Sequence, residues 1–402
     1  MPYLLITSMS LEGLYLLISR FKEFTLNPFY FRNFNIDGLS RWFFGYPQID
    51  SFLRAILYTP QHLQATVFLI MALYTSIFKK NYFITSLFIV FCGFSSFFLG
   101  FVAGIVFAIY FLYLLLKEKQ WKPIAGFSGL GLISLIVVIK LEMIKLQPNL
   151  TLVKPSFMKM LIVIFLNLGV VFIPSLIGWY FLIRKEKLKE NLALLLCFLT
   201  SFFFVFFVQL RHFPLDVGLK IGLILQLMVF LGLVFFILKV LPRKAILPFV
   251  GLILITGFLT TMMEIYNTLD IKNRKFTLRI PKDEMKMAKW ISNNLPKNAV
   301  VQTFPLVREE FFSLIPVFGE RNAYVGDKWH TIIFNMKISQ YQHRLNRLKY
   351  ILTHLRGVQL RRALKKEGID YLFYGRKERA AFPPPHLRKV KQINKVILFS
   401  VK

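Results

Sequence analysis

Several apolar stretches in this sequence are about as long as a lipid bilayer is thick, and this feature most constrains what the chain can fold into. A helix needs roughly 20 mostly apolar residues to cross the hydrocarbon core, and residues 98–116 and 214–238 each supply such a run. Hydrophobic residues make up 56% of the 402 residues, whereas soluble domains contain roughly 45–50%. We therefore predict a polytopic α-helical membrane protein. The predicted spans of this domain, which covers residues 1–266, are 2–19, 61–78, 82–96, 98–116, 124–139, 157–183, 191–210, 214–238 and 245–266.

The apolar run over residues 82–116 is too long for a single span. As one continuous helix it would extend about 52 Å, well beyond the hydrocarbon core. The stretch "GFSS", Gly93 to Ser96, contains residue types at which helices readily end. We predict two helices that separate at this stretch.

Lys and Arg are unevenly distributed between the loops, which predicts the orientation of the chain in the membrane. One set of loops holds 12 Lys and Arg in 23 residues: 79–81, 117–123, 184–190 and 239–244. The opposite set holds nine in 65 residues: 20–60, 94–97, 140–156 and 211–213. Because cytoplasmic loops carry the excess of basic residues, we predict that loop 20–60 and everything after Tyr266 lie outside the cytoplasm, with the chain in the cell membrane.

The first residues do not have the pattern of a signal peptide. A signal peptide has a basic start and a small-residue cleavage site, whereas Met1 is followed directly by "PYLLITSMSLEGLYLLI", which contains Glu12. We expect this chain to be the later part of a longer membrane protein. The next segment, loop 20–60, is rich in aromatic residues. These suit either an aromatic belt at the membrane interface or the floor of a substrate groove.

Residues 275–402 have a different pattern, in which helical and extended segments alternate. Segments 280–296 and 341–368 read as helices, the second as two of them. Four further segments read as strands: 298–304, 322–326, 369–375 and 395–401. This alternation predicts a small C-terminal extracytoplasmic α/β domain.

The C-terminal region is strongly basic. Residues 271–402 hold 28 Lys and Arg against nine Asp and Glu, which is +19 of the total formal charge of +31. Such a region beside a membrane favours anionic lipid headgroups or phosphorylated substrates, although a well-solvated surface has the same composition. Nucleic acid is not an expected partner, because the sequence has no recognised binding motif and the basic region is joined to membrane spans. Cys92 and Cys197, both within apolar runs, predict neither a disulfide framework nor a cysteine metal site.

Five segments resemble bacterial membrane glycosyltransferases of the GT-C superfamily. Three lie in the C-terminal region: "WISNNLPKNAVV" (290–301), "GERNAYVGD" (319–327) and "LKKEGIDYLFYGRKER" (364–379). Two lie in the membrane region: "LYTPQHLQA" (57–65) and "FPLDVGLKIGLILQL" (213–227). The resemblance implies an enzyme that takes a sugar from a polyprenyl-phosphate carrier and transfers it, on the outer face of the membrane, to a glycan, lipid or protein acceptor of the cell envelope.

The resemblance also implies an acidic motif in the first external loop. Loop 20–60 has no adjacent acidic pair and offers only the isolated Asp37 and Asp50. Either one of these carboxylates serves in catalysis, or the catalytic segment preceded Met1. His62, at the outer start of a span, is a candidate base or sugar ligand, and Glu12 and Glu142 are weaker acidic candidates. We identify no metal-ligand set, and whether a divalent cation takes part stays open.

The stretch "RHFPLDVGLKIG" places charged residues where an apolar helix begins at the outer boundary. Arg211 and His212 precede the helix, while Asp216 and Lys220 share one helical face at i and i+4. A local Asp–Lys pair with a snorkelling Arg explains them structurally. The functional hypothesis is a pocket for the phosphate of a lipid carrier, since Arg and Lys both bind phosphate and charges at this depth are functional by default.

The external domain has one stretch that suits sugar recognition. "GDKWHT" concentrates charged and aromatic side chains, and we predict a sugar or acceptor site formed by Arg321, Asp327, Lys328, Trp329 and His330. A turn after a strand would contain the same residues without a function. Two alternatives to the glycosyltransferase stay open: a non-catalytic membrane protein that binds carrier lipid or acts as a scaffold, and a transporter of lipid-linked sugars. Paired inverted repeats would favour the transporter, and we do not find them in the sequence.

Overall fold

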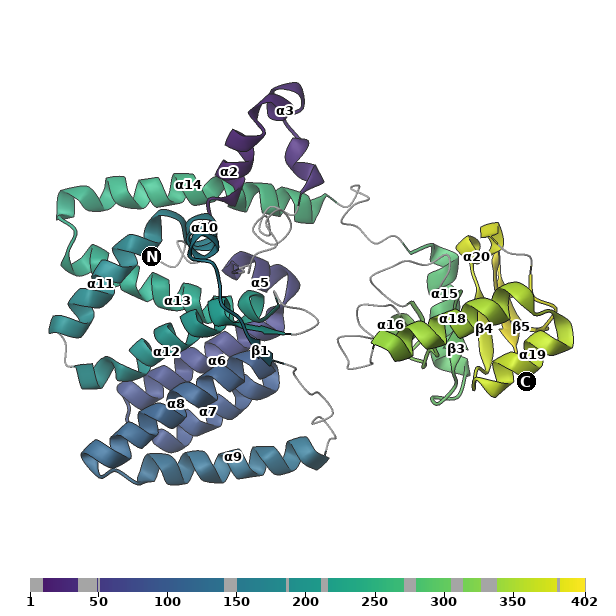
Figure 1. The fold of residues 1–402 in the computed structure, drawn as a ribbon, viewed down its shortest axis with the longest axis horizontal. Coiled ribbons are helices and arrows are strands. Elements are labelled where there is room, and N and C mark those ends of the chain that lie inside the picture. The colour runs from purple at the N-terminus through teal and green to yellow at the C-terminus, as the bar shows by residue number, and fades with distance from the viewer. Residues whose placement is uncertain are drawn as a thin grey trace. The chain divides into compact units, whose positions relative to one another are not determined.

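A computed structural model describes residues 10–34, 49, 51–140, 150–185, 188–210, 216–270, 280–304, 314–326, 338–381 and 384–401. The contacts of the chain fall into two compact units. Unit 1 contains the elements up to residue 270 and unit 2 the elements from residue 280 onward (Figure 1).

Unit 1 is almost entirely helical. Its helices are α2 (Glu12–Ser19), α3 (Phe21–Leu26), η1 (Tyr30–Asn33), α5 (Phe52–Tyr58), α6 (Pro60–Ile77), α7 (Tyr82–Ser95), α8 (Phe97–Glu118), α9 (Lys122–Lys140), α10 (Phe157–Leu168), η4 (Gly169–Val171), α11 (Phe172–Lys185), α12 (Leu188–Phe207), α13 (Asp216–Lys239) and α14 (Arg243–Leu269). The break predicted at Gly93 to Ser96 is confirmed, because α7 ends at Ser95 and α8 begins at Phe97.

Four segments of the described chain are long and apolar enough to cross a membrane, by length and composition. They are Phe97–Glu118, Phe157–Arg184, Val217–Lys239 and Arg243–Leu269. α7 and most of α12 are shorter apolar helices. The predicted span 61–78 corresponds to α6, which is not among the four because its first turns contain Gln61, His62 and Gln64.

Two short strands in unit 1 differ from the sequence-based expectation. β1 (Leu150–Leu152) and β2 (Val208–Leu210) form an antiparallel pair. The segment 140–156 was expected to be a loop, and 191–210 a continuous span. Instead, α12 ends at Phe207 and the chain extends to pair with β1. Three-residue strands bury too few side chains to leave a period-two pattern that a sequence could show.

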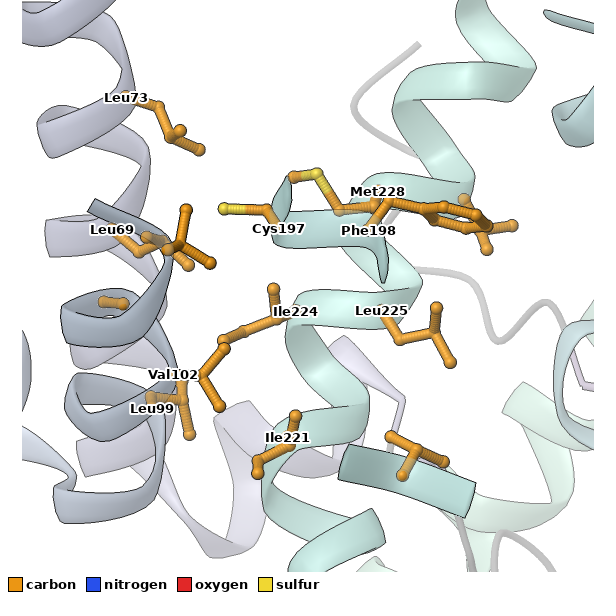
Figure 2. Packing of buried hydrophobic residues seen from close by; sticks show 14 of the residues in the cluster. Leu69, Leu73, Leu99, Val102, Cys197, Phe198, Ile221, Ile224, Leu225 and Met228 are labelled. Carbon is orange, nitrogen blue, oxygen red and sulfur yellow. The ribbon is translucent and has the colours of Figure 1, made fainter. Parts of the chain in front are cut away.

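The core of unit 1 lies between α6, α8, α12 and α13 (Figure 2). In Figure 2, Leu69 and Leu73 of α6 and Leu99 and Val102 of α8 are drawn opposite side chains of α12 and α13. α11 and α13 lie so close together that a Cβ atom on Gly178 would collide with the backbone of Gly232. Such small residues let membrane helices pack by direct van der Waals contact.

The loop after α2 packs on the C-terminal end of α14. Asn267 Nδ2 donates to Phe34 O at 3.0 Å, and Arg32 forms an ion pair with Asp270 at 2.6 Å. Aromatic residues of this segment line an apolar groove of about 550 Å³ between α2, α3, η1 and α14. This part of the aromatic loop 20–60 therefore packs against a helix.

Unit 2 is a layered α/β fold. Its strands are β3 (Val301–Gln302), β4 (Tyr371–Tyr374), β5 (Arg388–Ile393) and β6 (Val396–Ser400), in the order β3-β4-β6-β5. Its helices are α15 (Lys282–Asn294), α16 (Leu314–Phe318), α18 (Ile338–His354), α19 (Gly357–Lys366) and α20 (Arg376–Ala381). β3 and β4 are parallel, whereas β6 is antiparallel to both β4 and β5.

Alternate side chains of the central strands enter two separate cores. Phe373 and Leu398 pack with α15 and α16, while Leu372 and Phe399 pack with α18 and α19. Because successive side chains of a strand point to opposite faces, the two helix pairs cover opposite faces of the sheet. The predicted helices at 280–296 and 341–368 and the strands at 369–375 and 395–401 are confirmed.

Two strand predictions in unit 2 need correction. The segment 322–326 is not a strand, because Asn322 forms only an isolated bridge with Val300, and 298–304 contains only the two-residue β3. β5 was not predicted. Its sequence "RKVKQI" is exposed along most of its length, so it lacks the apolar alternation that identifies a half-buried strand.

Candidate functional site

The first residues of α6, α8 and α13 meet at one end of unit 1. His62 lies in the first turn of α6, and its Nδ1 forms a 2.9 Å hydrogen bond with Oγ of Ser96, which directly precedes α8. Lys220, in the second turn of α13, places its Nζ 4.5 Å from the ring centroid of Phe98 in α8. The three helices therefore begin side by side.

Local sequence explains why Ser96 reaches His62. Ser96 has extended backbone angles, with φ −153° and ψ 111°, between two helices. Beside this break, Gly93 and Gly100 lie so close that a Cβ atom on Gly100 would collide with the backbone of Gly93. On the other side, Pro60 is at the start of α6, where its fixed φ favours helix initiation. These features set the positions of the two helix ends.

Lys220 is a partly buried cation within an apolar helix. Its ammonium lies over the Phe98 ring and is close enough to His62 for the two groups to interact electrostatically. A cation–π contact contributes about 0.5–2 kcal/mol, so the Phe98 ring helps to stabilise this charge at the start of α13.

The end of α10 connects residue 49 to the same end of unit 1. Asn167 is buried, and its Oδ1 accepts a 3.0 Å hydrogen bond from the backbone N–H of Ile49. A Cβ atom on Gly222 would lie 3.0 Å from Ile49, so glycine at position 222 lets Ile49 approach α13 closely. Ile49 therefore contacts α13 two residues along the helix from Lys220.

Two buried carboxylates lie where α2 packs on α14. Thr260 Oγ1 accepts a hydrogen bond from Gly13 N at 3.0 Å and donates to Ser10 O at 2.8 Å. This arrangement holds Glu12 at the start of α2, fully buried, while Glu264 lies one turn beyond Thr260 and is 4% exposed. Leu11 N also donates to Leu166 O at 2.8 Å, which joins α2 to the end of α10.

Glu12 is a weak acidic candidate from the sequence, and Glu264 is not among the predicted site residues. The sequence nevertheless contains a signal for Glu264, because it is an isolated acid in the apolar run 245–266. An ionisable residue inside such a run is a functional-site hypothesis by default, and the structure shows that both carboxylates are buried.

The electrostatics of this end of unit 1 favour an anion. A helix N-terminus carries roughly half a positive charge and offers unpaired N–H groups to a phosphate or carboxylate. Three such termini meet here, together with Lys220 and His62. Chemically, this combination can bind a phosphate, and the imidazole of His62 can accept a proton from a hydroxyl group.

Most other predicted site residues lie outside the residues that the structure describes. These are Asp37, Asp50, Glu142, Arg211, His212, Asp327, Lys328, Trp329 and His330. For Asp216 only the backbone is described, at the first position of α13. The structure therefore brings His62 and Lys220 together and leaves the remaining proposed contacts as predictions.

Arg321, predicted to contact a sugar or acceptor, is buried in unit 2 with 6% of its surface exposed. Its guanidinium donates to the carbonyl oxygens of Ser292 at 2.6 Å and of Leu295 at the end of α15. It also donates to Glu320 O at 2.9 Å. These bonds satisfy carbonyls that a helix end leaves without partners, so the described contacts of Arg321 are structural.

The described part of the chain contains no group of three or more His, Cys, Asp or Glu residues placed to hold a metal ion. A divalent cation therefore has no protein ligand set among these residues.

No protein-family model matches this sequence, and no curated protein matches it. Among solved structures, the chain is similar to the archaeal oligosaccharyltransferase AglB from Archaeoglobus fulgidus, determined in complex with an inhibitory peptide and a dolichol-phosphate. The match covers 78% of this chain at 10% identity, with a TM-score of 0.28. The chain spans 45% of the length of that protein. A TM-score this low does not establish a shared fold or a shared function.

Proposed function

We propose that this chain is a membrane glycosyltransferase that binds the phosphate of a polyprenyl-linked sugar at the shared end of α6, α8 and α13. The acceptor is a glycan, lipid or protein of the cell envelope, and transfer takes place on the outer face of the membrane. The observation that carries the proposal is the position of Lys220 beside His62, where three helix N-termini meet.

This position suits a lipid-linked phosphate better than a neutral ligand. The helix N-termini and the ammonium group of Lys220 all favour negative charge. The same residues lie at the ends of largely apolar helices, where the headgroup of a membrane lipid would lie. In the transfer reaction, the bond between the sugar and the phosphate breaks and the phosphate leaves as an anion. Cations at this site would therefore stabilise the leaving group as charge develops on it.

Removing the charge of Lys220 tests the proposal. Lys220→Met retains a long apolar side chain but loses one charge-assisted contact, worth about 1.5–3 kcal/mol. We expect the affinity for a short-chain polyprenyl phosphate to fall roughly tenfold to over a hundredfold. The matched control is Lys239→Met, at the other end of the same helix and exposed. Binding to the purified chain in nanodiscs provides the measurement.

The control decides how the result is interpreted. Equal affinity of wild type and Lys220→Met, with the variant folded, would rule out phosphate binding at Lys220. An equal loss in both variants would point to the overall charge of the protein and count against a specific site.

A further inference from the structure

Unit 2 brings exposed cations from two elements to one end of its sheet. Arg361 of α19 donates from Nε to Val401 O at 3.1 Å, immediately after β6. On the other side of β6, Arg388 pairs in register with Ser400 and Lys389 with Phe399. The start of β5 and α19 therefore both lie at the end of β6. Because successive side chains of a strand point to opposite faces, Lys389 shares with Phe399 the face of the sheet that α18 and α19 cover, whereas Arg388 points to the other face. We call this surface the basic end and define it by the exposed residues Arg362, Lys365 and Lys389.

The carboxylates of unit 2 are engaged elsewhere. Its described part holds 20 Lys and Arg but only six Asp and Glu, and each of the six accepts a hydrogen bond within the unit. The acceptors and their partners are Asp283 with Arg376 Nε, Glu284 with Arg376 N, Glu320 with Ser292, Glu367 with Tyr324 and Arg347, Asp370 with Val300 N, and Glu378 with Gly375 N. None of these bonds involves a residue of the basic end.

Exposed apolar side chains accompany the cations. Val358, one turn before Arg362 on α19, is 65% exposed, and Val390, next to Lys389 on β5, is 39% exposed. Basic residues attract anionic headgroups, while neighbouring apolar groups enter the boundary between headgroups and acyl chains. A soluble polyanion would use the cations but would leave the two valines in water.

The covalent structure keeps unit 2 close to a membrane. Asp270 ends the apolar helix α14, and unit 2 is described from Ile280 onward. Ten residues of extended chain span at most about 36 Å, so a lipid surface around unit 1 is always within reach.

We propose that the basic end docks on anionic phospholipid headgroups and holds unit 2 against the membrane surface. This interaction requires no substrate or carrier, so it does not rest on the proposed sugar transfer. Each Lys or Arg near an anionic surface contributes about fivefold to membrane partitioning at physiological salt.

A fluorescent label at position 358 tests the proposal in the full chain. Val358→Cys can be labelled selectively because Cys92 and Cys197 are fully buried. The labelled protein is placed in nanodiscs of phosphatidylcholine alone or mixed with phosphatidylglycerol, each with a trace of lipid that carries a nitroxide quencher on its headgroup. We expect strong quenching in the mixed nanodiscs, little in phosphatidylcholine, and loss of quenching at high salt.

Two three-residue variants show whether the location of the charges matters. The test variant is Arg362→Gln, Lys365→Gln and Lys389→Gln. The control removes three exposed lysines of α15, on the opposite face of the sheet, through Lys282→Gln, Lys286→Gln and Lys289→Gln. We expect the test variant to lower the docking constant about a hundredfold and the control to quench like wild type. Hydrogen exchange of β6 amides confirms that both variants fold.

Three results would overturn the proposal. The first is a label that stays unquenched in mixed nanodiscs. The second is an equal loss of quenching in both variants, which would make net charge the cause. The third is inorganic polyphosphate that binds through the three residues of the basic end while the label stays unquenched, which would assign this surface to a soluble polyanion.

Discussion

Lys220 and Arg321 show how the surroundings of a cation indicate its role. The guanidinium of Arg321 is buried and donates to backbone carbonyls at the end of a helix. Lys220, by contrast, lies at the start of a helix over an aromatic ring and beside His62. A helix C-terminus has partial negative charge and an N-terminus partial positive charge. Arg321 therefore stabilises the C-terminal end of α15, whereas Lys220 adds a positive charge to the positive N-terminal end of α13.

Replacing Arg321 should therefore destabilise unit 2. Gln is too short at position 321 to reach both Ser292 O and Leu295 O, and losing a charge-assisted hydrogen bond costs about 1.5–3 kcal/mol. Arg362→Gln, on the exposed face of α19, should change stability by less than about 0.5 kcal/mol. Urea unfolding of unit 2, followed by pulsed hydrogen exchange of β4 and β6 amides, measures both. A folded Arg321→Gln protein with unchanged stability would contradict this structural role.

Glu12 and Glu264 are buried carboxylates of unit 1 and are tested here as the general base of the proposed transfer. A positioned general base contributes about 10²- to 10⁴-fold to rate. If either residue has this role, Glu12→Gln or Glu264→Gln should lower sugar transfer at least 100-fold while affinity for polyprenyl phosphate changes little. The control is Glu23→Gln, whose side chain is 35% exposed. Full transfer activity in both buried variants would move the base to another residue.

At the scale of elements, a hydrogen-bonded group joins α18 to the end of α19. The Tyr324 hydroxyl donates to Glu367 Oε2 at 2.6 Å, and Arg347 Nε donates to Glu367 Oε1 at 3.1 Å. The hydrogen bonds from Tyr324 and Arg347 lower the pKa of Glu367. Burial, together with the bond to Glu367, raises the pKa of Tyr324 to about 12. The pair is therefore most stable with Glu367 ionised and Tyr324 neutral.

These pKa shifts predict that the free energy of unfolding of unit 2 decreases at both acidic and alkaline pH. Because the pKa of Glu367 is lowered on folding, its contribution is present above the ordinary value of 4.5 and is lost as pH falls below it. Because the pKa of Tyr324 is raised, its contribution is present below the ordinary value of 10.0 and is lost as pH rises toward 12. In Tyr324→Phe, the urea midpoint of unit 2 should fall less between pH 10 and 12. An identical alkaline profile in wild type and Tyr324→Phe would contradict this.

At the scale of the whole molecule, sequence patterns located the elements that bury side chains. The "GFSS" stretch predicted the break between α7 and α8, and the apolar residues of β4 and β6 predicted the centre of the sheet. β5 was missed because its Lys and Arg side chains are exposed at the sheet edge, where charges discourage pairing with other chains. Edge strands of this kind have no buried face for a sequence pattern to reveal.

The candidate site was only partly predictable. Lys220 and His62 stood out because polar groups at the start of apolar helices are costly. Their meeting with Ser96 and Phe98 was not predictable, because it depends on how three helices far apart in sequence pack. Glu264 had a sequence signal, but its burial against α2 depends on hydrogen bonds between residues nearly 250 positions apart.

The central claim is that a lipid-linked phosphate binds where α6, α8 and α13 begin. The most direct measurement is photo-crosslinking with a polyprenyl phosphate that carries a diazirine next to the phosphate, followed by mass-spectrometric mapping of the labelled residues in the full chain. We predict labels within the first two turns of these helices, around His62, Phe98 and Lys220, and competition by unlabelled polyprenyl phosphate. Labels confined to the apolar groove beside α14 or to unit 2, with none at these three helix starts, would contradict the account.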